Sequence, residues 1–502
     1  MVLVTVDCLR SDHLPCYGYD RDTAPRLSAF ARNACLFETA WATGPSTPFS
    51  FPGIMASRMP FTSSSYGLLG ARLTLAEMLH HQGYGTYGFT GANAHLSPYF
   101  GYDRGFDRLS DFLEYNADPA VLRRLERDSR FGRNLPRLRA WSQRLLSRLT
   151  KTVRSLPPAE ALAERTGRLW RPLVETLWHS NNSRLKRRQE EASWREVLNW
   201  FREAHPEPFF LWVHVMTAHE PYCSSAENQV AVNGRAISGG RAVQLRRMMA
   251  AVNQGRSGKP DDRAVPDLVA LYDAAVRETD DHLGRLLARL EERGWLDPSL
   301  IIVTADHGEQ LMDHGYSQHP AFHYDEQLRV PLLIRLPGQR RGRRIRHQVG
   351  LIDLMPTVAD LLDIPLPEGA CEGSSFAELL RGTAPPEHPE RFYVSESFYS
   401  RHYVAHSLDW HNLQSTPRRV SFQNNSLKLI VDCRSGKAQA FDLSRDPREE
   451  RDLTGRRPEL ARLARSLARC HVRRSERVRA GKTIRRKQGP YPRPGSRPPH
   501  VP

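Results

Sequence analysis

The stretch SLIIVTADHGE, residues 299–309, carries the two signals on which the fold prediction depends. Its first seven residues form a short apolar run, which is typical of a strand buried on both faces of a parallel sheet. The run stops at Asp306 and His307, whose side chains are common metal ligands. In an open α/β sheet, ligands bind beyond the carboxyl ends of the strands. The stretch therefore predicts a central strand that ends in a functional site.

Two further apolar runs have the same character. They are MVLVTVD at residues 1–7 and PFFLWVHV at 208–215. Between the runs lie amphipathic segments such as residues 271–294, in which apolar side chains recur at helical spacing. Strands that alternate with helices in this way predict an α/β fold, with a doubly wound, mostly parallel sheet flanked by helices.

The composition of the chain changes near RGTAPPEHPER, residues 381–391. Beyond it, NSLKLIVDC and GKAQAFDL predict an antiparallel pair joined at the turn around Ser435 and Gly436. We expect a large domain at 1–380 and a small C-terminal α+β subdomain at 381–470. The Pro/Arg-rich remainder, 471–502, is expected to be a disordered tail.

The chain is basic, and arginine supplies most of its positive charge. Its 72 Lys+Arg against 56 Asp+Glu give a formal charge of +16 over 502 residues, of which 40% are hydrophobic. Such a bias suits nucleic acid, an anionic membrane or an anionic substrate. Because an arginine excess also follows from coding composition, nucleic acid is not the favoured partner.

A basic helical insert is expected at about 115–200, and its most basic part is 120–154. Leucines there fall on one helical face. A basic amphipathic helix of this kind suits an anionic membrane surface, or a lid over an anionic substrate. The alternative, a surface helix that docks its leucines on the core, is favoured.

The seven cysteines are scattered and form no CxxC pair, which favours a reducing compartment. The opening MVLVTVD lacks the basic and long apolar regions of a signal peptide, and no apolar run is long enough to span a bilayer. We therefore expect a cytoplasmic protein. The oligomeric state is not predicted.

Asp7 follows the first strand as Asp306 and His307 follow the later one. Two carboxylates and an imidazole suit one divalent metal ion, with Mn²⁺ or Zn²⁺ favoured and Ca²⁺ or Mg²⁺ as alternatives. Each motif alone is weak, since an Asp after a strand is often only a helix cap.

The stretch ATGPSTPFSFPG, residues 42–53, offers hydroxyl groups between two apolar segments. Thr47 precedes Pro48, and proline is preferred at the start of a helix, so Thr47 is expected near a helix N-terminus that favours anions. A metal ion would activate its hydroxyl as a nucleophile. The alternatives are a capped turn and a helix that begins only at Pro52.

Several ordered motifs resemble the sulfatase-like branch of the alkaline phosphatase superfamily, across most of the chain. The matching segments are VLVTVDCLRSDHLPCYGY (2–19), TAPRLSAFARNACLFETAW (23–41), LAEMLHHQGYGTYGFTG (75–91), PFFLWVHVMTAHEPY (208–222), IIVTADHGEQLMDHG (301–315), YDEQLRVPLLIRLPG (324–338) and AFDLSRDPREERDL (440–453). The resemblance makes residues 1–380 a sulfatase-like catalytic domain.

The nucleophile motif departs from the family. Sulfatases that use formylglycine carry Cys-x-Pro-x-Arg, whereas here Thr47 stands at the Cys position and Phe51 at the Arg position. The resemblance therefore implies no formylglycine. It implies the Thr-nucleophile type of lipoteichoic-acid-synthase-like and phosphoethanolamine-transferase-like relatives. Cys8 replaces the family's second Asp, and Ser46 is a second candidate nucleophile.

By this resemblance the metal ligands are Asp7, Thr47, Asp306 and His307. His219 is implied as the general acid, with His214 near it, and His319 falls where the family places a cation that faces the substrate anion. The remaining substrate-binding candidates are Arg10, whose fork could hold an anionic oxygen or form a surface ion pair, and Asn93 and His95 of GANAH, which replaces the family's GKWH.

The expected function is a metal-dependent hydrolase or transferase that acts on an anionic phospho- or sulfo-ester through Thr47. One alternative is a true sulfatase that uses unmodified Thr47 or Ser46. The other is an inactive binding module that keeps the fold and binds lipid or nucleic acid through residues 120–154.

Overall fold

A computed structural model describes residues 1–62, 67–68, 70–113, 186–253, 263–319, 321–383, 391–397 and 419–485. The basic segment 120–154 and the chain beyond 485 lie outside the described residues, and so do the predictions made for them. Of the expected insert, 186–200 is described and forms a helix.

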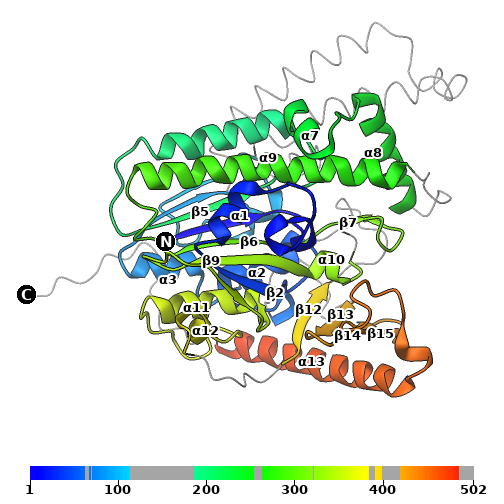
Figure 1. The fold of residues 1–502 in the computed structure, drawn as a ribbon. Coiled ribbons are helices and arrows are strands. Elements are labelled where there is room, and N and C mark those ends of the chain that lie inside the picture. The colour runs from blue at the N-terminus through cyan, green and yellow to red at the C-terminus, as the bar shows by residue number, and fades with distance from the viewer. Residues whose placement is uncertain are drawn as a thin grey trace, which may run out of the picture.

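The core of the molecule is a nine-stranded, mostly parallel sheet with helices on both faces (Figure 1). This confirms the predicted fold class. The strands, in spatial order, are β10 (Arg343–Ile345), β2 (Cys35–Trp41), β9 (Arg329–Arg335), β6 (Ile301–Ala305), β1 (Val2–Val6), β5 (Phe209–Val215), β3 (Gly85–Phe89) and β4 (Arg108–Ser110), with β11 (Val349–Gly350) paired to β2.

The three strands predicted from their apolar runs lie side by side at the centre. β1 pairs in parallel with β5 on one side and with β6 on the other. Every residue of the three strands is buried, because helices cover both faces of the sheet. β9 runs antiparallel to β6 and β2, which makes the sheet mixed.

The predicted amphipathic helix is observed as α9 (Ala264–Glu292), which starts earlier than expected and covers one face of the sheet (Figure 1). The opposite face is covered by α2 (Thr47–Ala56), α3 (Leu75–His81) and α11 (Leu354–Leu361) (Figure 1). The helices α1 (Pro25–Ala31), α7 (Ala226–Asn233) and α8 (Gly239–Asn253) contact α9, and α12 (Ala377–Arg381) contacts α11.

Two short strands, β7 (Gln310–Leu311) and β8 (Ser317–Gln318), form a hairpin after β6, and α10 (Asp325–Leu328) leads into β9. The hairpin and α10 lie beyond the carboxyl end of β6 (Figure 1).

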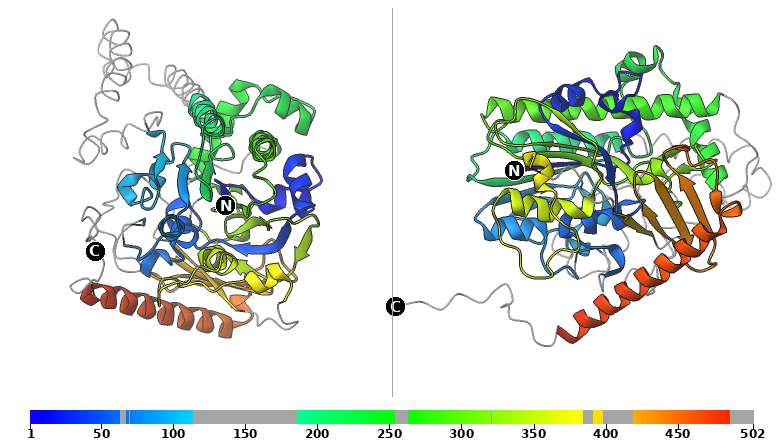
Figure 2. Two further views of the ribbon diagram at one scale, coloured as in Figure 1. Left: turned by 90° about the vertical axis from the view of Figure 1, so that its left-hand side faces the viewer. Right: turned by 60° about the horizontal axis from the view of Figure 1, so that its bottom comes forward.

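A second, four-stranded antiparallel sheet lies beside the main sheet. It consists of β12 (Tyr393–Ser397), β13 (Arg419–Gln423), β14 (Leu427–Asp432) and β15 (Ala438–Asp442). The predicted pairing of the last two strands is confirmed. Helix α13 (Pro458–Arg485) packs three alanines, at positions 461, 464 and 468, against apolar side chains of this sheet (Figure 2).

The tail prediction is wrong at its start, because α13 continues past residue 470 to Arg485. His471 forms an ion pair with the buried Glu396, and Ser475 is buried. These contacts with the body hold a helix in a stretch whose composition alone indicated disorder. Among the described residues, we find no helix with the length and apolar character needed to cross a membrane.

Candidate functional site

Strand register brings the predicted acids together. Val6 is paired with both Ala305 and Val215, so β1, β6 and β5 reach their carboxyl ends at the same level. Asp7 directly follows β1 and Asp306 directly follows β6, and both residues are fully buried. Asp7 donates its backbone N–H to the Val215 carbonyl (2.9 Å) and thereby continues the sheet by one residue.

Thr47 is the first residue of α2, as the proline after it predicts. The alternative start at Pro52 is wrong, since that residue lies inside the helix. Thr47 Oγ1 lies 3.3 Å from Asp7 Oδ2 and 3.4 Å from His307 Nε2. The hydroxyl therefore stands at a helix N-terminus, where developing negative charge is favoured.

His307 has a defined tautomer. Its Nδ1 is 2.8 Å from the Gly308 carbonyl, which can only accept, so Nδ1 carries the proton and Nε2 presents its lone pair. That lone pair faces Asp7 Oδ1 and Asp306 Oδ2, each at 3.5 Å. Among the described residues, Asp306 Oδ2 has no hydrogen-bond donor although it is buried.

A cation fits this arrangement of donor atoms. Two carboxylate groups, a hydroxyl and an imidazole lone pair converge, and the Thr47 hydroxyl, 3.3 Å from Asp7 Oδ2 and 3.4 Å from His307 Nε2, can donate to only one of them at a time. So many acceptor atoms at close range are unfavourable unless positive charge lies among them. Ligands about 2.1 Å from a tetrahedral ion stand about 3.4 Å apart. The separations of 3.4 and 3.5 Å around His307 Nε2 match that spacing.

The pKa values of the two acids diverge. Burial and the neighbouring Asp7 charge raise the pKa of Asp306 to about 8. Burial also raises the pKa of Asp7, but the nearby His219, His214 and His307 outweigh it and hold that pKa well below its usual range. Burial lowers the pKa of His307 to about 4, so its ring is neutral and free to ligate at neutral pH.

His214 is buried and contacts Asp7 Oδ2 through Nε2 at 3.3 Å. Its Nδ1 lies 3.0 Å from the Thr5 hydroxyl, which also accepts from Trp212 Nε1. The structure thus places His214 beneath Asp7 as an orienting group. Asn93 donates to the same Asp7 oxygen at 3.0 Å and lies 3.4 Å from Thr47 Oγ1.

His219 and His319 lie next to each other, with ring centroids 5.1 Å apart. His219 Nδ1 donates to the Glu220 carbonyl at 2.5 Å, and burial lowers the pKa of His219 to about 3. His319 Nδ1 lies 3.2 Å from Glu309 Oε1, and this carboxylate outweighs burial and raises the pKa of His319. The His319 ring is 4.8 Å from that of His307.

A family model described as "Sulfatase" matches residues 1–364, well over half of the chain. The chain belongs to the sulfatase family. A second model, "N-sulphoglucosamine sulphohydrolase, C-terminal", matches residues 313–475 of this sulfatase-family chain.

Curated relatives and solved structures agree with this membership. Human arylsulfatase K is 27% identical over 316 residues, which are 58% of this chain and 56% of that protein. The multifunctional alkaline phosphatase superfamily protein PehA of Trinickia caryophylli is 28% identical over 293 residues, 54% of this chain and 56% of that protein. The chain thus spans about half the length of these curated relatives.

The crystal structure of the phosphonate monoester hydrolase of Agrobacterium radiobacter superposes with a TM-score of 0.61 at 20% identity. The superposition covers 96% of this chain and 95% of that one. At this identity the likeness concerns the fold, and it places the chain in the alkaline-phosphatase-type architecture of the sulfatase family.

The substrate-binding role predicted for Arg10 is corrected by the structure. The guanidinium is 5% exposed and donates to both carboxylate oxygens of Asp12, to both of Asp313 and to the Glu309 carbonyl. All of its N–H groups are engaged, so no donor is left for a substrate oxygen. Arg10 instead fixes the loop that follows Asp306.

Two other candidates, Ser46 and His95, are close in sequence to Thr47 and Asn93. Ser46 is the N-cap residue of α2, and its side chain makes no capping hydrogen bond. His95 is half-buried and stacks on Phe100 with a centroid distance of 6.2 Å. Burial lowers the pKa of His95 to about 4, so its ring is neutral at neutral pH.

Three residues of the site gave little sequence signal. Ser50, three residues after Thr47 and so on the same helix face, donates to the Asp306 carbonyl at 2.5 Å. Glu309 is fully buried beside His319. Lys186, in the helix at 186–200, donates to the carbonyls of His219 and Pro221. These residues are 33 and 35 positions away in the sequence, so no local pattern predicts the contact.

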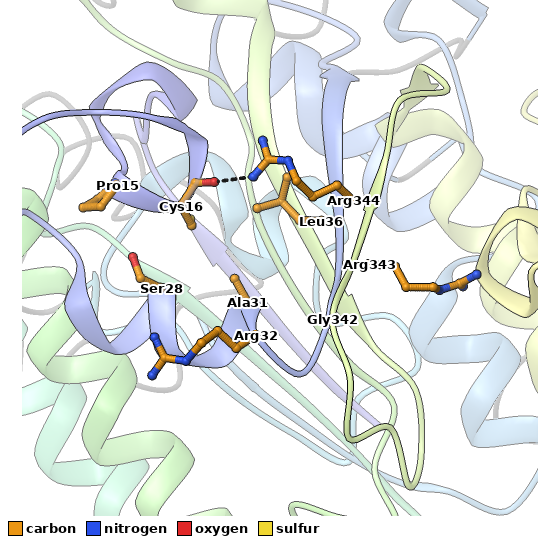
Figure 3. Close-up of a pocket in the computed structure, with 9 residues that line it drawn as sticks. All are labelled: Pro15, Cys16, Ser28, Ala31, Arg32, Leu36, Gly342, Arg343 and Arg344. Carbon is orange, nitrogen blue, oxygen red and sulfur yellow. Dashed lines mark hydrogen bonds between the residues drawn. The ribbon is translucent and has the colours of Figure 1, made fainter.

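A cavity of about 560 Å³ lies elsewhere, between the residues after β1, α1 and strands β2 and β10 (Figure 3). Its lining includes Cys16, Arg32 and Arg344, whereas Arg343 turns away toward carbonyls at the end of α12. None of the nine lining residues belongs to the cluster around Asp7.

Proposed function

We propose that this protein is a metal-dependent hydrolase or transferase that acts on an anionic phosphate or sulfate ester through Thr47. The observation that carries the proposal is the position of Thr47 Oγ1, at a helix N-terminus and within 3.4 Å of both Asp7 and His307. The names of the relatives, arylsulfatase and phosphonate monoester hydrolase, support this class of substrate.

Asp7, Asp306, His307 and Thr47 would hold the metal ion. When bound, such an ion stabilises the deprotonated form of the hydroxyl and neutralises charge on the ester oxygens. Imidazole together with carboxylates favours Mn²⁺ or Zn²⁺ over Ca²⁺ or Mg²⁺. The unpartnered Oδ2 of Asp306 and the Nε2 lone pair of His307 support this assignment.

Thr47 Oγ1, whose hydroxyl proton is released to solvent when it ionises, attacks the phosphorus or sulfur atom, and the bond to the leaving oxygen breaks as the bond to Thr47 forms. Asn93, 3.4 Å from this hydroxyl, donates to negative charge on it. We assign protonation of the leaving oxygen to the histidine pair His219 and His319, whose ring centroids lie 5.1 Å apart. The pairing with Glu309 favours the protonated form of His319, whereas burial favours the neutral ring of His219. Water or an acceptor alcohol then releases the Thr47 ester.

The test is turnover of bis-p-nitrophenyl phosphate and p-nitrophenyl sulfate by the wild type, Thr47→Ala and Ser46→Ala. We expect Thr47→Ala to lower kcat by on the order of 10³-fold or more, because the nucleophile is removed. Ser46→Ala is the matched control, one residue before it, and should retain most activity. Equal activity of Thr47→Ala and the wild type would refute the assignment.

The same assay decides between the two ester classes. The sulfatase alternative, with unmodified Thr47 or Ser46, is favoured by the likeness to arylsulfatase K and by the match to a sulphohydrolase C-terminal model. Preferential release of sulfate would establish it, and preferential cleavage of the phosphodiester would support the phosphoryl-transfer function. Loss of activity in Ser46→Ala but not in Thr47→Ala would identify Ser46 as the nucleophile instead.

A further inference from the structure

Lys186 holds the loop that carries His219. It lies in the helix at 186–200, and its Nζ donates to the carbonyls of His219 and of Pro221, the second at 2.9 Å. Between these two carbonyls, that of Glu220 accepts a hydrogen bond from Nδ1 of the His219 ring at 2.5 Å. The carbonyls on both sides of the one that orients the ring are therefore bound to a single ammonium group.

The Lys186 ammonium is buried, which is costly unless its three N–H donors find partners. Two of its partners are the carbonyls of His219 and Pro221. The third is the carboxylate of Glu190, four residues further along the helix and 3.8 Å from Nζ. Among the described residues these three groups surround the ammonium, so one conformation of the side chain satisfies it and that conformation fixes the loop.

Two further contacts fix the neighbouring backbone. Gln189, on the same helix as Lys186, donates to the Gly91 carbonyl at 2.6 Å, in the loop after β3. Arg246 of α8 forms an ion pair with Glu220 at 3.1 Å. The loop after β5 is therefore bound by two helices, and the first of these helices also binds the loop after β3.

We propose that Lys186 is a positioning residue for proton transfer to the leaving group, because it holds the His219 ring beside His319 through the backbone of residues 219–221. This inference rests on the proposed function, in which that histidine pair protonates the leaving oxygen. In that step a proton passes from an imidazolium N–H to the ester oxygen while the bond from this oxygen to phosphorus or sulfur breaks. A displacement of about 1 Å in a reacting group costs on the order of 10²-fold in rate.

The test compares two leaving groups on the same ester. The pairs are p-nitrophenyl sulfate with phenyl sulfate and bis-p-nitrophenyl phosphate with diphenyl phosphate, and the pair that the wild type cleaves is used. p-Nitrophenolate departs without a proton, whereas phenolate, whose conjugate acid has a pKa of about 10, requires one. The ratio of kcat/KM for the phenyl ester to that for the p-nitrophenyl ester does not depend on the folded fraction of a variant. It therefore separates proton transfer from stability.

Lys186→Met should lower this ratio by about 10–100-fold, and His219→Ala by at least as much. Arg188→Met is the matched control, since it removes a positive charge from an exposed position of the same helix, and it should keep the wild-type ratio. If Lys186→Met yields no folded protein, Lys186→Gln is measured in the same way. Its shorter side chain cannot reach both carbonyls, so the ratio should fall as well.

An unchanged ratio in the Lys186 variant would overturn the proposal. An equal fall in Arg188→Met, or a wild-type ratio in His219→Ala, would overturn it too. Thr47→Ala tests the proposed function separately, because it should abolish cleavage of both esters whatever the ratio in the Lys186 variant. Retained cleavage in Thr47→Ala would refute the nucleophile alone, and a wild type that cleaves neither pair would refute both proposals.

Discussion

Asp7 is the residue on which the site depends most directly. One of its oxygens is within 3.3 Å of Thr47, Asn93 and His214, and the other is 3.5 Å from His307. A carboxylate with this many partners has one usable orientation, and it fixes the position of Thr47 relative to the ends of β1 and β6. The position of the proposed nucleophile, Thr47, is therefore set by a side chain that would not itself react.

Arg10 acts on the same site from a distance, through ion pairs with Asp12 and Asp313. Burial raises the pKa of Asp313, but the Arg10 charge outweighs it and holds the pKa below its ordinary value. Because the folded-state pKa is lowered, the stabilisation is present above the unfolded-state pKa of about 3.9 and is lost as the pH falls through the folded-state value.

We therefore expect Arg10→Met to lower the free energy of unfolding by about 1–2 kcal/mol at pH 7, because Asp12 and Asp313 lose their cation but remain in contact with solvent. The difference between wild type and variant should shrink as the pH falls below about 4. Urea titrations at several pH values measure both effects, with Arg72→Met, on the exposed side of a loop, as control. A difference that stays constant between pH 7 and pH 3 would contradict this account.

At the scale of elements, α2 carries Thr47, the proposed nucleophile, and is packed closely against the loop that precedes it. Thr43 donates to the Phe49 and Ser50 carbonyls at 2.8 and 3.1 Å and so ties the loop after β2 to the helix. A Cβ added at Gly53 would lie 2.6 Å from Thr43 Cγ2 and 2.7 Å from Thr43 Oγ1, closer than real Cβ contacts. The helix and the loop approach this closely only because residue 53 is glycine.

Gly53→Ala is expected to destabilise the protein by about 1–3 kcal/mol through overpacking, although alanine is the better helix former. The ester turnover of Gly53→Ala should also fall, because Thr47 lies on the same helix. Gly240→Ala in α8 is the matched control, since nothing lies within 4 Å of its added Cβ, and it should gain up to about 1 kcal/mol. Thermal unfolding and ester turnover measure the two effects, and a stabilised Gly53→Ala would show that Thr43 can move aside.

Lys428 of β14 joins the two sheets. It is fully buried, forms ion pairs with Asp325 of α10 and with Glu449 (3.0 Å), and lies 5.5 Å from the ring centroid of Trp41 in β2. The two carboxylates outweigh burial and raise the pKa of Lys428. The C-terminal sheet is thus fixed to α10 and to the main sheet by one buried cation.

Lys428→Met is expected to cost about 3–5 kcal/mol, because it leaves two carboxylates buried without a cation. Lys437→Met, at an exposed position in the β14–β15 turn, should change the free energy of unfolding by less than about 0.5 kcal/mol. Denaturant titrations compare the two variants. Equal stability of both would mean that the buried carboxylates protonate at little cost.

At the scale of the whole molecule, the site depends on both sheets. Phe61, just beyond α2, donates its N–H to Glu396 of β12 at 3.0 Å, and Glu396 is paired with His471 of α13. His323, which precedes α10, bonds Ser421 and Ser397 of the second sheet at 2.9 and 2.8 Å. The C-terminal sheet and α13 therefore contact the segment that follows α2 and the segment that precedes α10.

A metal ion bound across the ends of β1 and β6 should stabilise this assembly. At a free Mn²⁺ or Zn²⁺ concentration of 100 times Kd, the free energy of unfolding should rise by about 2.7 kcal/mol, and a chelator should reverse the gain. Asp306→Ala should abolish most of the Mn²⁺ effect, whereas Asp297→Ala, a surface ion-pair partner of Arg335 and Arg340, should keep it. Metal-independent unfolding of the wild type would argue against the Asp7 site.

The sequence by itself determined the central strands and the edge at which the site forms. Apolar runs of five to seven residues and helical periodicity are local properties of the sequence. Parallel strands bring their carboxyl ends to one edge of the sheet, independently of the conformation of the loops. Asp7, Asp306 and His307 could be placed together for this reason. Thr47 could be placed at a helix start from the proline that follows it.

The tertiary structure alone decided which partner each side chain takes. Arg10 follows the first strand as a substrate ligand would, but its guanidinium is satisfied by Asp313, 303 residues away. Cys8, His219 and His319 meet through loops that share no sequence pattern. Helix α13 continues beyond residue 470 through contacts with a strand some 75 residues earlier. Periodicity is read along the chain, whereas burial and charge pairing are settled between distant segments.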